Sequence, residues 1–190
     1  MKKFVLIAAM VLSCNSKKEA AAVSEDSSSQ MPVKMTEISF TAPDSWIAEP
    51  PSSHLRKAQF KIPGKGDEGE AEMTVFYFPG AGGSVEANLD RWYGQFKQPD
   101  GSSSKDKASK ETRDINGLKV TVVSVTGVYQ KPVNPTMMGG PVTDVAGYGL
   151  KAAIVETEGG PWFFKMVGPE GTLDGASADF DQFVNTFSLK

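Results

Sequence analysis

The sequence has one cysteine, Cys14, and one histidine, His54, among its 190 residues. A single cysteine cannot form an internal disulfide bond, and one histidine without a second cysteine provides no zinc-type ligand cluster. A Ser-His-Asp triad could use only His54, and a Cys-His pair would need Cys14. The chain is therefore poorly supplied for nucleophilic or zinc-dependent catalysis, and we predict neither a metal nor a cofactor.

The chain also lacks an excess of basic residues. It carries 20 Lys and Arg against 23 Asp and Glu, a net charge of −3. Removal of residues 1–13 would take away Lys2 and Lys3 and leave 18 basic side chains, for a net charge of −5. A nucleic-acid partner requires a basic face that neutralises phosphates, so this balance argues against one.

No apolar run reaches the roughly 20 residues that a membrane-spanning helix needs. Instead, Lys2 and Lys3 precede a short apolar run, residues 4–12, as in a secretion signal. The run closes with Val11-Leu12-Ser13-Cys14, which resembles the lipobox of bacterial lipoproteins, although Val11 stands where leucine is more usual. The resemblance implies a signal peptide at 1–13 and lipid on Cys14. An ordinary cleaved signal that happens to end in cysteine is the alternative.

The segment after Cys14 has almost no large apolar residue. It cannot repay the entropy lost on folding, so residues 14–31 are predicted to form a lipidated cysteine and a disordered tether. A short helix centred on its alanines would serve as a tether equally well. A single folded domain is expected at 32–190.

Short segments of alternating apolar and polar residues begin this domain. They predict strands at 37–41, 57–62 and 71–78. A helix should follow, because Ser84 can cap it and Val85, Leu89, Trp92 and Phe96 recur at helical spacing. The glycines at 80, 82 and 83 could cradle an anion, but a plain turn from strand to helix is favoured because Glu86 would repel phosphate.

The second half repeats the order of strands followed by a helix. Residues 99–110 are predicted to be a loop, and Asn116-Gly117 indicates a hairpin turn before a strand at 118–129. Further strands are expected at 149–156 and 162–167. A closing helix places Leu173, Ala176, Phe180, Phe183, Val184 and Phe187 on one face, with Gly175 weakening its first turn. We therefore predict an α+β fold, a mainly antiparallel sheet covered by two amphipathic helices.

One stretch resembles a known family. Phe40-Thr41-Ala42-Pro43-Asp44-Ser45-Trp46 is similar to the F-x-x-P-x-x-W opening of the PsbP-like fold of DcrB- and LpqN-type lipoproteins. The helix after the third strand and the Phe-rich closing helix are similar too, so the likeness covers roughly residues 36–190. It implies an α/β/α sandwich and a non-catalytic accessory or binding role, and no ligand-binding residue of that family maps onto this chain.

Residues 131–147 contain three prolines, adjacent glycines, and the pair Met137 and Met138. A long loop of this kind is often functional, and neighbouring methionines make an adaptable apolar contact, so Met137 and Met138 are candidate partner-contact residues. The alternative is a surface loop whose methionines fold back over the sheet edge.

Three functions remain open from the sequence. The first is a lipid-anchored, non-catalytic domain of the bacterial cell envelope, facing the periplasm or exterior, that binds an envelope protein or a small ligand. The second is a membrane-tethered hydrolase built on carboxylates such as Glu70, Glu72 or Asp144 with His54. The third is a spacer lipoprotein without a specific ligand. The first is preferred, and we predict no catalytic residues.

Overall fold

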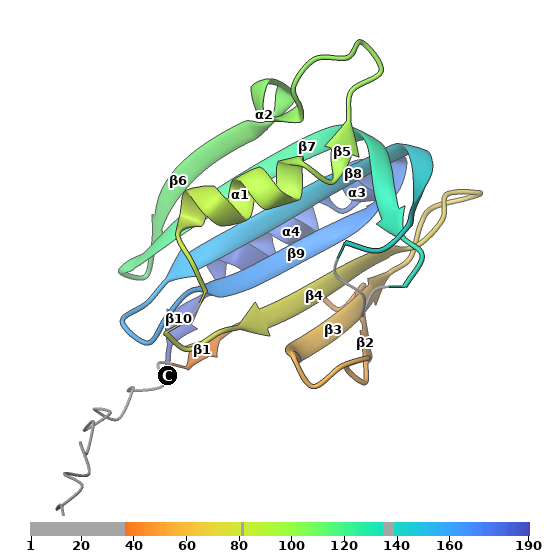
Figure 1. Ribbon diagram of the computed structural model, residues 1–190. Helices are drawn as coiled ribbons and strands as arrows, with labels where there is room; N and C mark the ends of the chain where they lie inside the picture. The colour runs from red at the N-terminus through yellow and green to blue at the C-terminus, as the bar shows by residue number, and fades with distance from the viewer. Residues whose placement is uncertain (1–36, 81, 135–138) are drawn as a thin grey trace, which may run out of the picture. The chain divides into compact units, whose positions relative to one another are not determined.

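The computed structural model describes residues 37–80, 82–134 and 139–190 (Figure 1). In chain order the elements are β1 (Ile38–Ser39), β2 (Ile47–Glu49), β3 (Arg56–Ile62), β4 (Ala71–Tyr77), α1 (Val85–Tyr93), β5 (Phe96–Lys97), α2 (Ser104–Lys107), β6 (Ser109–Ile115), β7 (Leu118–Pro132), β8 (Val142–Glu156), β9 (Trp162–Pro169), α3 (Glu170–Gly175), α4 (Ser177–Asn185) and β10 (Ser188–Leu189). The predicted signal peptide, tether and domain boundary lie outside these residues. Within them, no helix has the length and apolar character needed to cross a bilayer.

Eight of the strands form one antiparallel sheet. Its order is β2-β3-β4-β9-β8-β7-β5, and β6 pairs with β7 as well. The long strand β7 holds both, because residues 118–124 pair with β6 and residues 128–129 pair with β5. The strand β9 therefore lies in the middle of the sheet. The short strands β1 and β10 pair separately.

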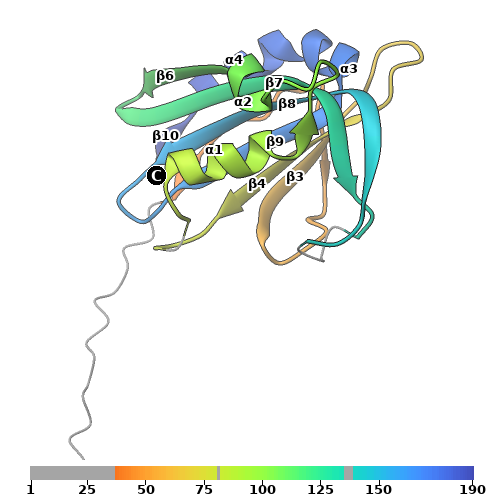
Figure 2. The ribbon, with the colours of Figure 1, turned by 45° about the horizontal axis from the view of Figure 1, so that its top comes forward.

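Helices cover both faces of the sheet, α1 on one side and α3 with α4 on the other (Figures 1 and 2). Side chains alternate along β9 between these two layers. Phe163 joins the cluster that contains Leu89 and Trp92 of α1, whereas Phe164 joins the cluster of α4. The predicted α+β class, with a mainly antiparallel sheet between helices, is confirmed.

Aromatic contacts fix α4 on its face of the sheet. Phe183 of α4 lies 5.7 Å from Phe164 and 5.5 Å from Phe40, measured between ring centroids. Trp46 lies 5.0 Å from the same ring, and its backbone N–H donates to the carbonyl of Pro43. The spacing of Phe40, Pro43 and Trp46 thus has a structural reason: a tight turn delivers two aromatic rings to one helical residue.

The predicted loop at 131–147 is wrong, because most of it is strand. The ladder between β7 and β8 continues through Lys131↔Thr143 and Pro132↔Val142, leaving only residues 133–141 to connect them. A β-bulge interrupts the ladder after Gly127, and Gly147 there has a φ of 68°. Glycine accepts this conformation, so a residue that suggested a loop in fact lets the strand bend.

Two further differences concern polar segments. The predicted loop at 99–110 contains the short helix α2, and β6 begins at its end. The sequence of β6, Ser-Lys-Glu-Thr-Arg-Asp-Ile, lacks apolar alternation because most of its side chains are exposed at an edge of the sheet. The hairpin turn at Asn116-Gly117 is confirmed, since both residues have positive φ, 52° and 79°.

The closing helix is interrupted. It divides at Ala176 into α3 and α4, directly after Gly175. All six predicted apolar positions are nevertheless buried, on the face turned to the sheet. The periodicity predicted the buried face correctly, while glycine marks the break.

Candidate functional site

Three of the predicted site residues lie outside the described ranges. These are Cys14, the expected lipid attachment residue, and Met137 and Met138, the expected partner contact. Their roles remain predictions.

The structure separates the residues of the alternative hydrolase site. His54 is exposed in the turn between β2 and β3, and Asp144 forms an ion pair of 2.9 Å with Lys97. Only Glu70 and Glu72 come together, on the wall of a groove that neither His54 nor Asp144 lines. Within the described ranges, no three His, Cys, Asp or Glu side chains gather as a metal site would require.

The glycines before α1 form a close-packed turn, as favoured above. A Cβ atom at Gly82 would lie 2.2 Å from Cγ of Pro161, so only glycine fits. The side-chain amide of Asn88 donates to the carbonyl of Gly82 at 2.7 Å, and Ser84 caps the helix by accepting from the N–H of Ala87. The turn serves to start α1 and pack it on the sheet.

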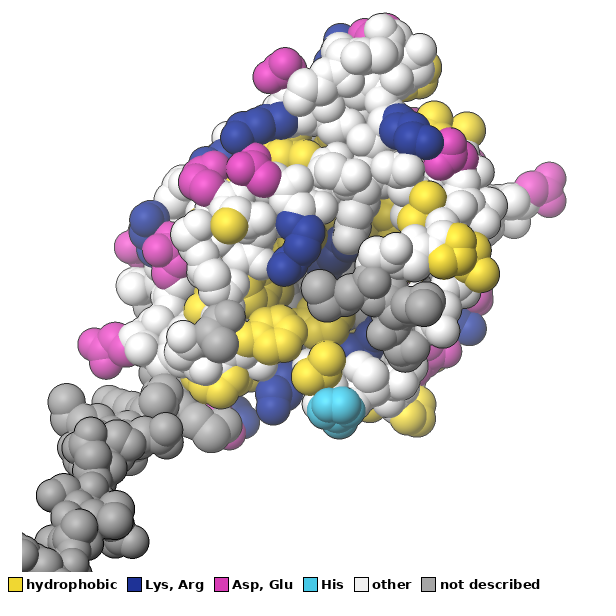
Figure 3. All heavy atoms as spheres, viewed as in Figure 1, with side chains coloured by type: hydrophobic (Ala, Val, Ile, Leu, Met, Phe, Trp, Pro, Cys, Tyr) yellow, Lys and Arg dark blue, Asp and Glu magenta, His cyan; other side chains and the backbone are white. Residues whose placement is uncertain are grey.

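The groove has a volume of about 580 Å³ and opens on the α1 face of the sheet. Its floor comes from β4 and β9, and its sides from β2 and β3, the end of α1, and the distal parts of β7 and β8. Figure 3 looks onto this face and shows hydrophobic side chains beside Lys and Arg side chains in a hollow at its centre. Small-molecule sites are typically clefts of this size, roughly 300–1,000 Å³.

Six aromatic side chains line the groove: Phe76, Phe78, Trp92, Tyr129, Tyr148 and Phe163. Four of them, the two tyrosines with Phe76 and Phe78, are only half-buried. The rings of Tyr129 and Tyr148 are nearly parallel, with centroids 6.0 Å apart. The groove therefore presents flat apolar surfaces to anything that enters it.

A lysine lies among these rings in the central strand. Lys165 follows Phe163 on the same face of β9, and its Nζ atom donates a hydrogen bond of 2.6 Å to Oε1 of Gln95. The backbone of Gln95 holds that amide in place, since its N–H donates to Trp92 and its carbonyl accepts from Gln130. The ammonium group is thereby fixed at the base of the groove.

Burial lowers the pKa of Lys165 to about 8, because the charged form loses hydration. The charges of Arg91 and Arg56 lower this pKa further, while Glu72 opposes them. Lys165 thus still carries its charge at neutral pH, in a region where positive charges repel one another. Perturbed titratable groups in clefts are typical of functional sites.

The carboxylates of the groove gather on one side of it. Glu72 pairs with Arg56 at 2.8 Å, and Lys61 lies between Glu49 at 3.3 Å and Glu70 at 3.2 Å. Arg56 also lies over the ring of Phe76, with Cζ 6.0 Å from its centroid. The groove itself therefore shows that a planar cation and an aromatic ring pair favourably in this environment.

The opposite side has cations without such partners. Among the described residues, no carboxylate forms an ion pair with Lys165, Arg91 or Lys131. Arg91 instead donates to Oδ1 of Asn88 at 2.6 Å. Five cations and three acids line the groove in all, so its positive excess contrasts with the net charge of −3 of the chain.

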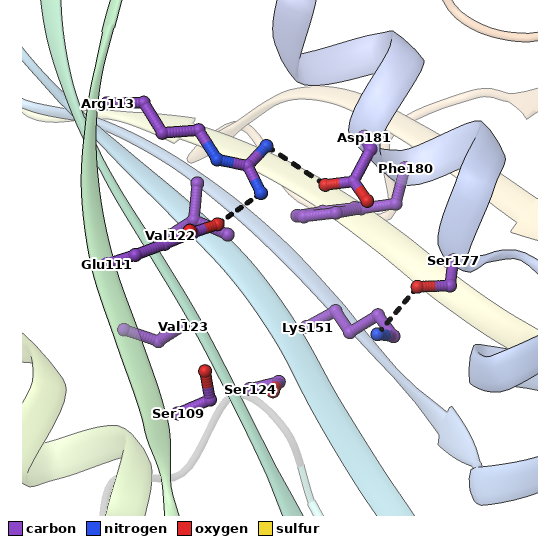
Figure 4. A pocket seen from close by; sticks show the side chains of 10 residues that line it. All are labelled: Ser109, Glu111, Arg113, Val122, Val123, Ser124, Lys151, Ser177, Phe180 and Asp181. Atoms are coloured by element: carbon purple, nitrogen blue, oxygen red, sulfur yellow. Dashed lines mark hydrogen bonds and ion pairs between the residues drawn. The ribbon is translucent and has the colours of Figure 1, made fainter.

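A smaller cavity of about 170 Å³ lies on the other face, between β6 to β8 and α4 (Figure 4). Here each cation has a partner: Arg113 pairs with Asp181 at 2.9 Å, and Lys151 donates to the hydroxyl of Ser177 at 3.0 Å. These bonds join the sheet to α4. Lys151 therefore provides a half-buried lysine in a neighbouring strand with a structural role.

The sequence analysis missed the groove, although one signal was present. Lys165 is the only charged residue in the run Trp162-Phe163-Phe164-Lys165-Met166-Val167. A charge in the middle of an apolar strand indicates either an edge strand or a site, and the topology decides between them. The other groove residues come from six strands and a helix, a convergence that no local pattern carries.

Comparison with protein-family models and with curated protein sequences gave no match. Three solved structures are similar. They are a Pseudomonas aeruginosa protein of unknown function, PA94 (14% identity, TM-score 0.48, 80% of this chain and 97% of that one), the cyanobacterial PsbP of Synechocystis sp. PCC 6803 (16%, 0.47, 80% and 86%) and LpqN of Mycobacterium tuberculosis, involved in cell envelope biogenesis (10%, 0.46, 82% and 84%). PsbP and LpqN are also the proteins that the sequence resembles. At these identities and TM-scores, the likeness assigns no function to this chain.

Proposed function

We propose that the protein is a lipid-anchored, non-catalytic binding domain of the bacterial cell envelope, with the groove as its ligand-binding site. The lipid would be attached to Cys14, and the domain would face the periplasm or exterior. The groove would hold an anionic ligand with an apolar body.

Lys165 is the observation that carries the proposal. A half-buried ammonium without a carboxylate partner destabilises the folded state, because burial disfavours charge. A methionine of similar length would fill the same space without this penalty. Destabilising side chains of this kind are typical of functional positions, where stability is given up for binding.

The other polar groups of the groove support binding over catalysis. They are cations, an amide, and carboxylates already engaged by Arg56 and Lys61. A general base would need a free carboxylate or imidazole within hydrogen-bond reach of a substrate. Glu70 and Glu72 are instead held by ion pairs.

The anchor rests on the lipobox-like residues before Cys14. Two or three acyl chains on this residue would give stable membrane attachment, which a single chain does not. Growth with labelled palmitate and membrane fractionation tests this: label and membrane recovery are expected for the natural chain and neither for Cys14→Ser. Label on the Cys14→Ser chain would contradict the anchor.

Native mass spectrometry of the full chain isolated from its own cells tests the groove. A small-molecule adduct is expected on the natural chain and on Lys151→Met, and it should be lost from Lys165→Met. Identical spectra for the natural and Lys165→Met chains would contradict the proposed site. The Lys151 variant controls for removal of a half-buried lysine from the same sheet.

A further inference from the structure

We propose that the ligand is a small planar aromatic carboxylate, with its ring system on the aromatic lining and its carboxylate on Lys165 and Arg91. This deepens the proposed function and rests on it. Charge, shape and hydrogen-bond capacity support the assignment independently.

The charge of the ligand follows from the uneven distribution of ions in the groove. The acids Glu49, Glu70 and Glu72 lie on the β2 to β4 side, where Lys61 and Arg56 neutralise them. Three cations on the other side have no such partner in the described part of the chain. An anion at that side would relieve their mutual repulsion, whereas a cation would add to it.

The hydrogen-bond capacity of these cations is only partly used. Lys165 gives one hydrogen bond to Gln95, out of three that an ammonium can donate. Arg91 gives one to Asn88, out of five that a guanidinium can donate. The planar guanidinium fork matches a carboxylate geometrically, and charge-assisted bonds of this kind are among the stronger ones.

The shape of the ligand follows from the lining. Six aromatic side chains face the groove, against the aliphatic carbons of Ala71, Pro132 and Val167. Rings prefer stacked or edge-on contacts with other rings, and these contribute beyond the apolar area that they bury. The parallel rings of Tyr129 and Tyr148 and the flat surface of Phe76 therefore favour a planar ring system over a flexible alkyl chain.

Calorimetric titration with three matched probes tests the proposal. The probes are 2-naphthoate, the uncharged 2-naphthamide, and decanoate, which keeps the carboxylate but has no ring. The full chain with Cys14→Ser is used, so that no lipid or detergent enters the groove. We expect 2-naphthoate to bind at least about tenfold more tightly than either other probe, the effect of one charge-assisted hydrogen bond.

Two variants locate the carboxylate. Lys165→Met and Arg91→Met should each reduce the affinity for 2-naphthoate about tenfold or more and leave 2-naphthamide unchanged. Lys151→Met, on the opposite face of the sheet, should change neither. Retention of the preference in both groove variants would overturn the placement of the carboxylate.

The outcomes separate this inference from the proposed function. Equal affinities of naphthoate and naphthamide would refute the anion, and equal affinities of naphthoate and decanoate would refute the aromatic body. In both cases the groove would still bind its probe, and the proposed function would stand. Absence of saturable binding for all three probes would contradict both.

Discussion

Lys165 and Gln95 join the middle of the sheet to the end of α1, through a hydrogen bond of 2.6 Å from Nζ to Oε1. The bond gives a charged side chain a fixed position in an otherwise apolar layer. It does not neutralise the charge, because an amide oxygen carries only a partial one. The positive potential remains available to a ligand, and this has measurable consequences for stability.

Replacement of Lys165 by methionine is expected to stabilise the protein. The lowering of its pKa from 10.5 to about 8 corresponds to roughly 2–3 kcal/mol of unfavourable free energy at neutral pH. Loss of the bond to Gln95 offsets about 1 kcal/mol of this. Urea unfolding at pH 7 should therefore show a free energy of unfolding about 1–2 kcal/mol higher for Lys165→Met. Lys151→Met, which loses a bond to Ser177, should be no more stable than the natural chain, and a less stable Lys165→Met would refute the argument.

Stability and anion binding should change in opposite directions with pH. The folded-state pKa of Lys165 lies below its unfolded value, so the folded chain loses this proton first as the pH rises. Arg56 and Arg91 assist the loss, and Glu72 opposes it. The free energy of unfolding should rise by about 2 kcal/mol from pH 7 to about 9.5, below the range where Tyr93 and Tyr129 titrate.

Over the same pH range, the affinity for 2-naphthoate should fall, because Lys165 becomes neutral. Calorimetry and urea unfolding measured at each pH check both trends. Lys165→Met should show neither, and a pH-dependent affinity in that variant would assign the titration to another group.

The two faces of the sheet should respond differently to loss of a ring. Phe183→Ala removes a buried side chain that contacts Phe40, Trp46 and Phe164, and should cost about 3–5 kcal/mol. Phe76→Ala removes a half-buried ring at the groove and should cost about 1–2 kcal/mol. Thermal unfolding measures both, and 2-naphthoate affinity should fall only for Phe76→Ala. An equal loss of stability would mean that the groove is part of the core.

Two glycines offer a contrast between backbone freedom and close packing. A Cβ at Gly175 meets nothing within 4 Å, so Gly175→Ala should stabilise the chain by about 0.5–1 kcal/mol, through reduced freedom of the unfolded state. Gly82→Ala would place its Cβ against Pro161 and should destabilise it by about 1–3 kcal/mol. Urea unfolding of the two variants gives the comparison, and the same sign for both would contradict it.

Sequence reasoning predicted the elements whose signals are local. Ser84 caps α1 as expected, Asn116 and Gly117 form the hairpin turn, and the apolar face of α3 and α4 is buried. The long ladder of β7 and β8 was missed because its prolines and glycines suggest a loop. They are tolerated there by a bulge and by the end of a ladder, which depend on the partner strand.

The candidate site was not predicted for a related reason. Lys165, Gln95 and Arg91 are polar residues of ordinary kind at unrelated places in the chain. Only the pairing of β9 between β4 and β8, with α1 packed above, turns them toward one cavity. Their spatial relationship depends on the order of the strands, which local periodicity does not encode.

The pairing of β1 with β10 has a mechanical meaning. Glu37 accepts a hydrogen bond from the N–H of Lys190, and Thr41 donates to the hydroxyl of Thr186. A pull along the chain that precedes residue 37 would therefore first load this small pair of strands, which belongs neither to the large sheet nor to the wall of the groove. The two-stranded pair would act as a strain relief, so that tension at the amino-terminal end is absorbed at the carboxyl-terminal strand before it can deform the cavity.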